Sequence, residues 1–173
     1  MKTLLIIASL LLISPPLVMA FWDAGDFQVT SPAFGNNEVI PKDYTCNGGD
    51  VNPPLIFKNV PPKTKSFAIT VSDPDAPEGV WSHWVVYNIS PATRQIKENS
   101  NPGTEGLSDF GKYVYGGPCP QDEKVHHYIF RVFALNDLLY INEGPSFAEV
   151  EKAVRFHTIA KSELTGTYQK LPF

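Results

Sequence analysis

Sixteen prolines and twelve glycines are spread along the whole chain, where they divide its apolar stretches into segments of strand length. They do not cluster in one place, so no linker between domains is indicated. The 173 residues, 43% of them apolar, are enough to bury the core of one domain rather than two. The sequence therefore predicts a single, β-rich domain.

Three apolar segments are the strongest candidates for strands. In residues 66–72 (SFAITVS), large apolar residues alternate with smaller ones, which indicates a strand with one strongly buried face. Residues 83–90 and 127–135 are almost continuously apolar, so both of their faces should be covered. Such strands are central in a sandwich of two antiparallel sheets, the fold class that we predict. Residues 91–113 are polar and glycine-rich, and we interpret them as a surface excursion between two strands.

The C-terminal part of the chain carries a helical signal instead. Ser146 and Glu149 have the spacing of a capping box, in which each satisfies a backbone donor near the other. Residues of packing type then recur at helical spacing, at Val150, Val154, His157, Ala160 and Leu164. We expect one amphipathic helix against the sheets that ends near Gly166, with His157 packed rather than bound to a ligand.

The first twenty residues have the features of an export signal. Lys2 precedes an apolar run over residues 4–13, and the small-residue pattern Val18-Met19-Ala20 follows it. The alternative is a membrane anchor, but the run is short for a bilayer span and two prolines interrupt it. We expect cleavage after Ala20, a mature domain over residues 21–173, no remaining transmembrane anchor, and a periplasmic or secreted protein.

Charge and cysteine content narrow the function classes. The formal net charge of −4 disfavours the phosphate backbone of nucleic acids and anionic membrane surfaces. Any anion must therefore be held by local groups. Cys46 and Cys119, in an exported chain, are a possible disulfide, the alternative being two separate buried thiols.

The segment SDPDAPEGVWSHW, residues 72–84, combines acidic, aromatic and imidazole groups beside a predicted strand end. Asp73 and Asp75 flank a proline, and Pro77 fixes another backbone angle, so the chain must turn there. Aspartates beside prolines commonly form Asx turns, which is the simpler interpretation. Trp81 and His83 lie two residues apart and so share one strand face, which favours a ligand site over a buried histidine bonded to a carbonyl.

A second pair of rings stands at the start of a later strand. His126 and Tyr128 also share a face by their spacing, whereas His127 alternates with them and is assigned a packing role. Upstream lies the run Tyr115-Gly116-Gly117-Pro118, whose glycine N–H groups are suited to a concave nest for an anion. A plain turn is the alternative for this run.

Four blocks in this order resemble the phosphatidylethanolamine-binding proteins, a family whose animal members include the Raf kinase inhibitor protein. The blocks are TCNGGDVNPPLIF, DPDAPEGVWSHWVVYNI, DFGKYVYGGPCP and HHYIFRVFAL, and the closing SELTGTY is most similar to the bacterial branch. The resemblance implies a β-sandwich with a terminal helix beside a small pocket that binds anions such as phosphate groups. The positions that match the family's pocket are Asp73, Asp75, Pro77, Trp81, His83, Gly116, Gly117, Pro118, His126 and Tyr128.

The chain departs from the family pattern at Asn52, Phe57 and Gln121, where serine, tryptophan and proline are usual. These departures put the ligand preference in doubt. Two roles for the aspartates stay open. Either Asp73 or Asp75 faces the ammonium of a zwitterionic headgroup, or the two keep the imidazoles charged for a plain anion.

We therefore expect an exported protein that binds an anion or a phospholipid headgroup, needs no cofactor or metal and has no catalytic residues. Members of the resembled family are described as inhibitors or signalling modules, so the resemblance implies a partner such as a protease or kinase. The alternative is a hydrolase that uses the Asp and His groups with acid–base or metal assistance. It lacks a nucleophile, because Ser82 and His83 point to opposite faces of one strand.

Overall fold

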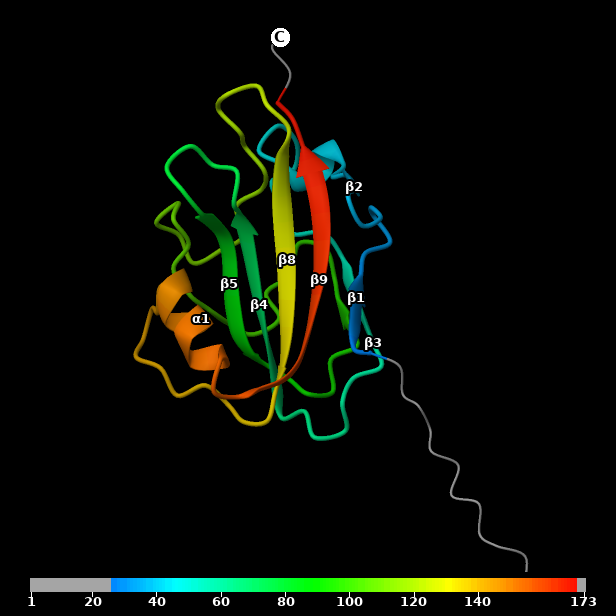
Figure 1. Ribbon diagram of the computed structural model, residues 1–173, viewed down its shortest axis with the longest axis vertical. Helices are drawn as coiled ribbons and strands as arrows, with labels where there is room; N and C mark the ends of the chain where they lie inside the picture. Colours follow the sequence, from blue (N-terminus) through cyan, green and yellow to red (C-terminus); the bar gives the residue numbers. More distant parts are fainter. Residues whose placement is uncertain (1–25, 171–173) are drawn as a thin grey trace, which may run out of the picture.

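The computed structural model describes residues 26–170, which form two β-sheets and one α-helix (Figure 1). The predicted fold class is confirmed. The larger sheet has the order β2-β9-β8-β4-β5-β7 and the smaller β1-β3-β6, and only β2 and β9 form a parallel pair among these strands. The bounds of the larger sheet are β2 Glu38–Val39, β4 Ser66–Asp73, β5 Trp81–Ile89, β7 Thr104–Glu105, β8 His126–Leu135 and β9 Thr158–Tyr168. Those of the smaller sheet are β1 Gln28–Thr30, β3 Leu55–Lys58 and β6 Gln95–Ile96, and a short 3-10 helix spans Lys42–Tyr44.

The main core lies between the two sheets. Phe57 of the small sheet and Phe67 of β4 have ring centroids 5.1 Å apart, and Phe27 stacks on Phe67 at 6.0 Å. Each ring is buried, which stabilises the fold by roughly 2 kcal/mol per side chain. The alternation seen in β4 points Phe67, Ile69 and Val71 into this core.

A second, smaller core covers the other face of the large sheet. The helix α1, Phe147–Val154, buries Val150 and Val154 against Ala68 of β4 and other residues of β5 and β8. Every residue of β4 is buried, so the prediction of a single buried face for residues 66–72 was wrong. The two-sided covering is confirmed for β5, but in β8 it holds only over the last four residues, because His127, Ile129 and Arg131 lie on a face that is open or half-covered.

The predicted helix begins where expected but is much shorter. The capping box of Ser146 and Glu149 is present, yet the helix ends at Val154, and β9 follows. The prediction failed because residues four apart, such as Ala160 and Leu164, also lie on one face of a strand, whose period is two. Pairing with β8 along nearly all of β9 then supplies the backbone hydrogen bonds that a helix would have supplied.

The helical placement of two further residues was also wrong. Gly166 does not end a helix but lies in β9, where an added Cβ would come within 2.4 Å of Ile40. The close packing on β9 of Ile40, which follows β2, therefore favours glycine there. His157 lies in the turn before β9, half-buried, with its Nδ1 3.3 Å from Asn136 Oδ1.

The polar segment 91–113 does connect β5 to β8, as predicted, but it is tied to both sheets. It contributes β6 to the small sheet and β7 to the edge of the large sheet, and Ile96 is buried in the main core. Among residues 26–170, no helix is long and apolar enough to cross a bilayer. The predicted signal segment, residues 1–20, lies outside the described residues.

The expected disulfide is present. Cys46 and Cys119 are bonded across 73 positions of sequence, with Cα atoms 5.5 Å apart. The bond joins the loop after the 3-10 helix to the segment that leads into β8, and Cys46 N–H donates to the carbonyl of Pro118 nearby. The two segments are thus anchored to each other beside the start of β8.

Candidate functional site

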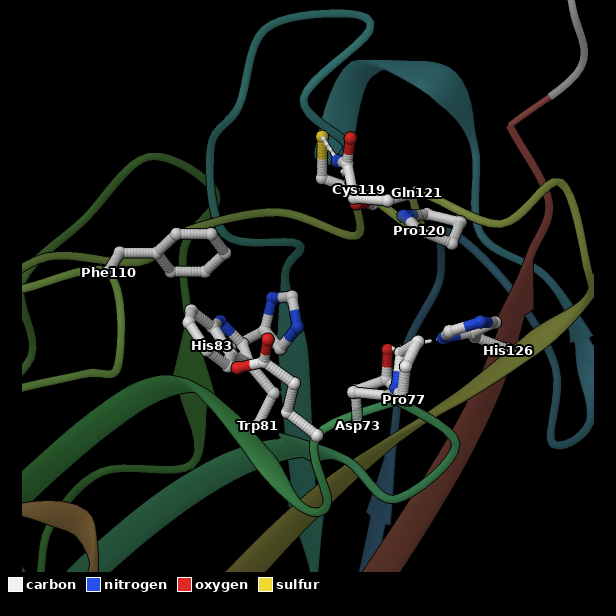
Figure 2. Close-up of a pocket in the computed structure, with 11 residues that line it drawn as sticks. Asp73, Pro77, Trp81, His83, Phe110, Cys119, Pro120, Gln121 and His126 are labelled. Carbon is white, nitrogen blue, oxygen red and sulfur yellow. Dashed lines mark hydrogen bonds and ion pairs between the residues drawn. The ribbon is translucent and has the colours of Figure 1, made fainter.

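The candidate site lies at one edge of the large sheet, where three strand ends meet (Figure 2). β4 is antiparallel to both β5 and β8, so its last residue, Asp73, stands beside the first residues of its two neighbours. Trp81 and His83 come from the start of β5, and His126 opens β8. The sequence places these groups far apart, and the antiparallel pairing brings them together.

A cavity of about 360 Å³ opens there, a size within the range of small-molecule sites. It is lined by Asp73, Ala76, Pro77, Glu78, Trp81, His83, Phe110, Cys119, Pro120, Gln121 and His126. No residue of α1 contributes to this lining. The prediction placed Asp73, Pro77, Trp81, His83 and His126 in the pocket, and all of these residues line the cavity.

His83 is a buried imidazole with one nitrogen committed and one available. Its Nδ1 lies 2.7 Å from the carbonyl oxygen of Gly116, which can only accept, so Nδ1 carries the proton. Nε2 has no hydrogen-bond partner among residues 26–170, and the side chain lines the cavity. Burial lowers the pKa of His83, which outweighs the opposing effects of the Gly116 carbonyl and Asp73. At neutral pH His83 therefore offers the cavity a lone pair rather than a positive charge.

His126 has the opposite character. Its Nδ1 lies 2.7 Å from Asp73 Oδ2 and its Nε2 lies 2.8 Å from Asp122 Oδ1, so both nitrogens donate to carboxylates. Burial by itself lowers the pKa of His126, but the hydrogen bonds and charges of Asp73 and Asp122 raise it overall. His126 is thus an imidazolium held between two aspartates.

Asp73 combines the two roles that its sequence context suggested. Its Oδ1 accepts a 2.8 Å hydrogen bond from the backbone N–H of Asp75, which is the expected Asx turn. Its other oxygen, Oδ2, holds His126. The side chain is only 5% exposed. Asp73 therefore shapes the turn and orients the imidazole at once.

Asp75 and His127 lie outside the cavity lining, and their predicted roles were wrong. Asp75 Oδ2 accepts 2.8 Å and 2.7 Å hydrogen bonds from His127 N and Nδ1, and both side chains are about half exposed. The hydrogen bond from the His127 ring lowers the pKa of Asp75. Alternation along β8 points His127 away from His126, but that face is open here rather than covered.

The predicted glycine nest does not form. The N–H of Gly116 donates to the carbonyl of His83 at 2.9 Å, and the N–H of Gly117 donates to Asp50 Oδ1 at 2.7 Å. The glycines serve close packing instead, because an added Cβ on Gly116 would come within 2.6 Å of the Phe110 ring. Neither glycine lines the cavity, and neither does Pro118.

The two predicted tyrosines lie behind the cavity wall. Tyr115 is buried, and its hydroxyl donates to the carbonyl of Tyr44 at 3.0 Å. Tyr128 packs edge-on against His83, with ring centroids 5.1 Å apart, and stacks beside His126 at 6.5 Å. Its hydroxyl is buried without a hydrogen-bond partner in residues 26–170. Burial and then the charge of Asp73 raise the pKa of Tyr128, so it stays neutral.

Sequence reasoning missed Phe110, which closes one side of the cavity (Figure 2). Its ring lies edge-on to Trp81 at 5.7 Å and to His83 at 5.1 Å. Reciprocal hydrogen bonds hold it there: Ser82 N–H donates to Asp109 Oδ2 at 2.7 Å, and Asp109 N–H donates to Ser82 Oγ at 2.9 Å. The available signal was an aromatic residue within a polar loop.

The other residues missed lie on the two loops that face each other across the cavity. Glu78 follows the predicted Pro77 in the loop after β4, and Pro120 follows the disulfide-bonded Cys119. Gln121, recognised only as a departure from the family pattern, lines the cavity, while its Nε2 donates to the carbonyl of Cys119 at 2.8 Å. These positions carried no spacing signal, because loop folding alone brings them to the site.

Three comparisons with known proteins bear on this arrangement. The model of the phosphatidylethanolamine-binding protein family matches residues 30–169. A UPF0098 protein of Pyrococcus horikoshii is 43% identical over 149 residues, which cover 81% of this chain and 75% of the relative. Another from Chlamydia pneumoniae is also 43% identical, over 83% of this chain and 99% of the relative.

Solved structures agree with the sequence relatives. A homologue of phosphatidylethanolamine-binding proteins from Chlamydia trachomatis superposes with a TM-score of 0.80 at 39% identity, covering 84% of this chain and 99% of that one. Escherichia coli YbcL, described as a new member of the mammalian family, gives 0.79 at 34% identity over 85% and 100% of the two chains. With its sandwich, its strand-end cavity and its match from residue 30 to residue 169, this chain belongs to the phosphatidylethanolamine-binding protein family.

Proposed function

We propose that this chain is an exported protein that binds small phosphate-bearing ligands of the phospholipid-headgroup type. The observation that carries the proposal is the state of His83 at the cavity. Its Nδ1 is fixed on the carbonyl of Gly116, and its Nε2 is left for a ligand. A protonated phosphate oxygen donates to this lone pair, and a protonated His83 donates to an ionised one.

The surrounding charges favour a ligand that is zwitterionic rather than purely anionic. Asp73 is occupied by His126, and Asp75 by His127, so neither is free to hold an ammonium group. Glu78 is the lining carboxylate without such a partner in residues 26–170. Together with the Trp81 ring, it suits a cationic amine that enters beside the phosphate.

Binding rather than turnover is supported by the state of the two candidate nucleophiles. The Oγ of Ser82 is engaged by the N–H of Asp109, and Cys119 is in the disulfide rather than a free thiolate. Export is supported by the apolar run at residues 4–13 and by the disulfide, which persists in oxidising compartments. The compartment is periplasmic or extracellular in this proposal.

The proposal includes a regulatory use of the same pocket. A protein partner, such as a protease or kinase, would present an acidic or phosphorylated segment to it and be modulated in turn. Loops that surround a rigid site commonly set such specificity. A pull-down that compares wild type with Phe110→Ala, which removes the ring that the loop after β7 contributes to the cavity lining, tests this part, and equal capture by both would exclude that ring as the partner determinant.

Isothermal titration calorimetry with phosphoethanolamine and with inorganic phosphate tests the central proposal. We expect saturable binding to the wild type, and a loss of about tenfold or more in His83→Gln, because a hydrogen bond to a charged ligand is removed. His157→Gln is the matched control, since His157 does not line the cavity and bonds to Asn136, beyond the opposite end of β8 from His126. No binding to the wild type, or equal binding to wild type and His83→Gln, would refute the proposal.

A further inference from the structure

The two carboxylates that hold His126 differ in how firmly they are placed. Asp73 ends a fully buried strand and is 5% exposed, whereas Asp122 lies in the loop before β8 and is 25% exposed. His126 itself is 2% exposed. One of its N–H groups is therefore bonded to a rigid partner and the other to a partner that a loop movement can withdraw.

The loop that carries Asp122 is also a wall of the cavity. Pro120 and Gln121, directly before Asp122, line it. Asp122 is held locally by Lys124, whose Nζ lies 3.3 Å from Oδ2 and whose backbone N–H donates to Oδ1 at 3.2 Å. Glu123 stands between them with a positive φ of 57°, a conformation that is uncommon for residues other than glycine. Beyond the loop's own residues, Glu123 is tied to the chain after β9 by a 2.7 Å hydrogen bond that Gln169 Nε2 donates to its carbonyl, while the Asp122 side chain itself is held by His126 and Lys124.

A carboxylate on an imidazolium N–H has the chemistry of a bound anion. The Asp122 Oδ1 atom lies 2.8 Å from Nε2, at the place where a phosphate or carboxylate oxygen of a ligand would have to lie. We propose that Asp122 is a built-in competitor for anionic ligands, which reach His126 Nε2 only when the loop carrying Asp122 moves aside. This inference rests on the proposed function and adds a second anion subsite, beside His83, that Asp122 closes.

The competition has a consequence for ligand choice. A tethered group acts at an effective concentration of about the millimolar range or above, so a weak free carboxylate competes poorly with Asp122. Phosphate, which presents more anionic oxygens and engages His83 as well, competes better. Competition by Asp122 therefore favours phosphate over simple carboxylates as the ligand.

Asp122→Ala tests the inference, with Glu123→Gln as the control because it removes one negative charge from the same loop without touching His126. We expect calorimetry to show phosphate binding about tenfold tighter in Asp122→Ala than in wild type, the worth of one hydrogen bond to a charged group. Glu123→Gln should stay within about twofold of wild type, since Glu123 is exposed, does not line the cavity, and has a charge that salt screens. Acetate should gain affinity in Asp122→Ala and shift the His126 imidazole nitrogen resonances.

The outcomes separate the inference from the proposed function. If wild type binds phosphate and Asp122→Ala binds it equally or more weakly, the competition by Asp122 is refuted and the proposed function is not. If neither wild type nor variant binds phosphate, both proposals are refuted. Binding by the variant only would support the competition by Asp122 and refute phosphate binding by the wild type. Thermal unfolding checks that the variant folds, and Asp122→Asn, which keeps the shape and removes the charge, decides the matter by the same criteria if Asp122→Ala does not fold.

Discussion

His83 and His126 are neighbours at one cavity, and each opens or nearly opens a strand, but the protein holds them in opposite states. A backbone carbonyl holds His83, and burial keeps it neutral. Two carboxylates hold His126, and it stays charged despite burial. Both imidazoles are buried, so the difference in charge comes from the two carboxylates around His126, which outweigh burial there while the carbonyl at His83 does not. His83 Nε2 is thereby available to a ligand. His126 Nε2 becomes available only when Asp122 moves away from it.

The largest expected effect comes from the bond that anchors the partners of both histidines. Cys119 stands between Gly116, which holds His83, and Asp122, which holds His126. The variant Cys46→Ser/Cys119→Ser should lose about 4 kcal/mol of unfolding free energy, because a loop of 73 positions is no longer closed in the unfolded chain. Urea unfolding measures this, and a loss below about 1 kcal/mol would show that the loop closure matters little.

The second largest loss of stability is expected at Asp73, the buried aspartate of the turn that also contains the exposed Asp75. Asp73→Ala should lower the free energy of unfolding by about 3 kcal/mol, because it leaves the buried His126 charge and the Asp75 N–H without their partner. Chemical denaturation measures the change. A loss near zero would mean that His126 simply becomes neutral, and the contrast between the two histidines would then depend on Asp73 alone.

The third prediction is a pH profile with two limbs. Since the folded pKa of His83 lies below its ordinary 6.5, the stability that it contributes is present above that pH and is lost as the pH falls. Since the folded pKa of His126 lies above 6.5, its contribution is present below that pH and is lost as the pH rises through the folded value. Unfolding measured from about pH 5 to about pH 8 should show both limbs.

Single variants identify each limb. His83→Gln should flatten the acid limb and His126→Gln the alkaline one, and nuclear magnetic resonance should place the two titrations on opposite sides of the ordinary value. Phosphate affinity in the wild type should rise as the pH falls into the range where His83 takes up a proton. Titration of both rings at the same pH would contradict the assigned difference.

The smallest effect is expected on the open face of the same sheet edge. Asp75→Ala removes the pair with His127, whose side chains are about half exposed, so the loss should be about 0.5 kcal/mol or less. It should also shrink at high salt, since exposed ion pairs are screened. A loss as large as that of Asp73→Ala would show that exposure is a poor guide in this turn.

Residue spacing predicted secondary structure and burial correctly where only one structure is compatible with the spacing. The continuous apolar run of β5 is covered on both faces, and the capping box of Ser146 and Glu149 has one geometry. It misled where two periods coincide, as for Ala160 and Leu164, whose spacing fits a helix and a strand equally. Exposure of His127 was also beyond the pattern, since alternation gives a face but not its covering.

The sequence by itself determined the β-rich class, the family resemblance and the chemical character of Asp73, Trp81, His83 and His126, because residue type and local spacing are properties of the chain alone. Only the tertiary structure decided that His83 rests on a carbonyl and His126 between two carboxylates, and that the glycine N–H groups are already used. Those outcomes depend on which atoms from distant segments come within hydrogen-bonding distance, and no local pattern encodes that distance.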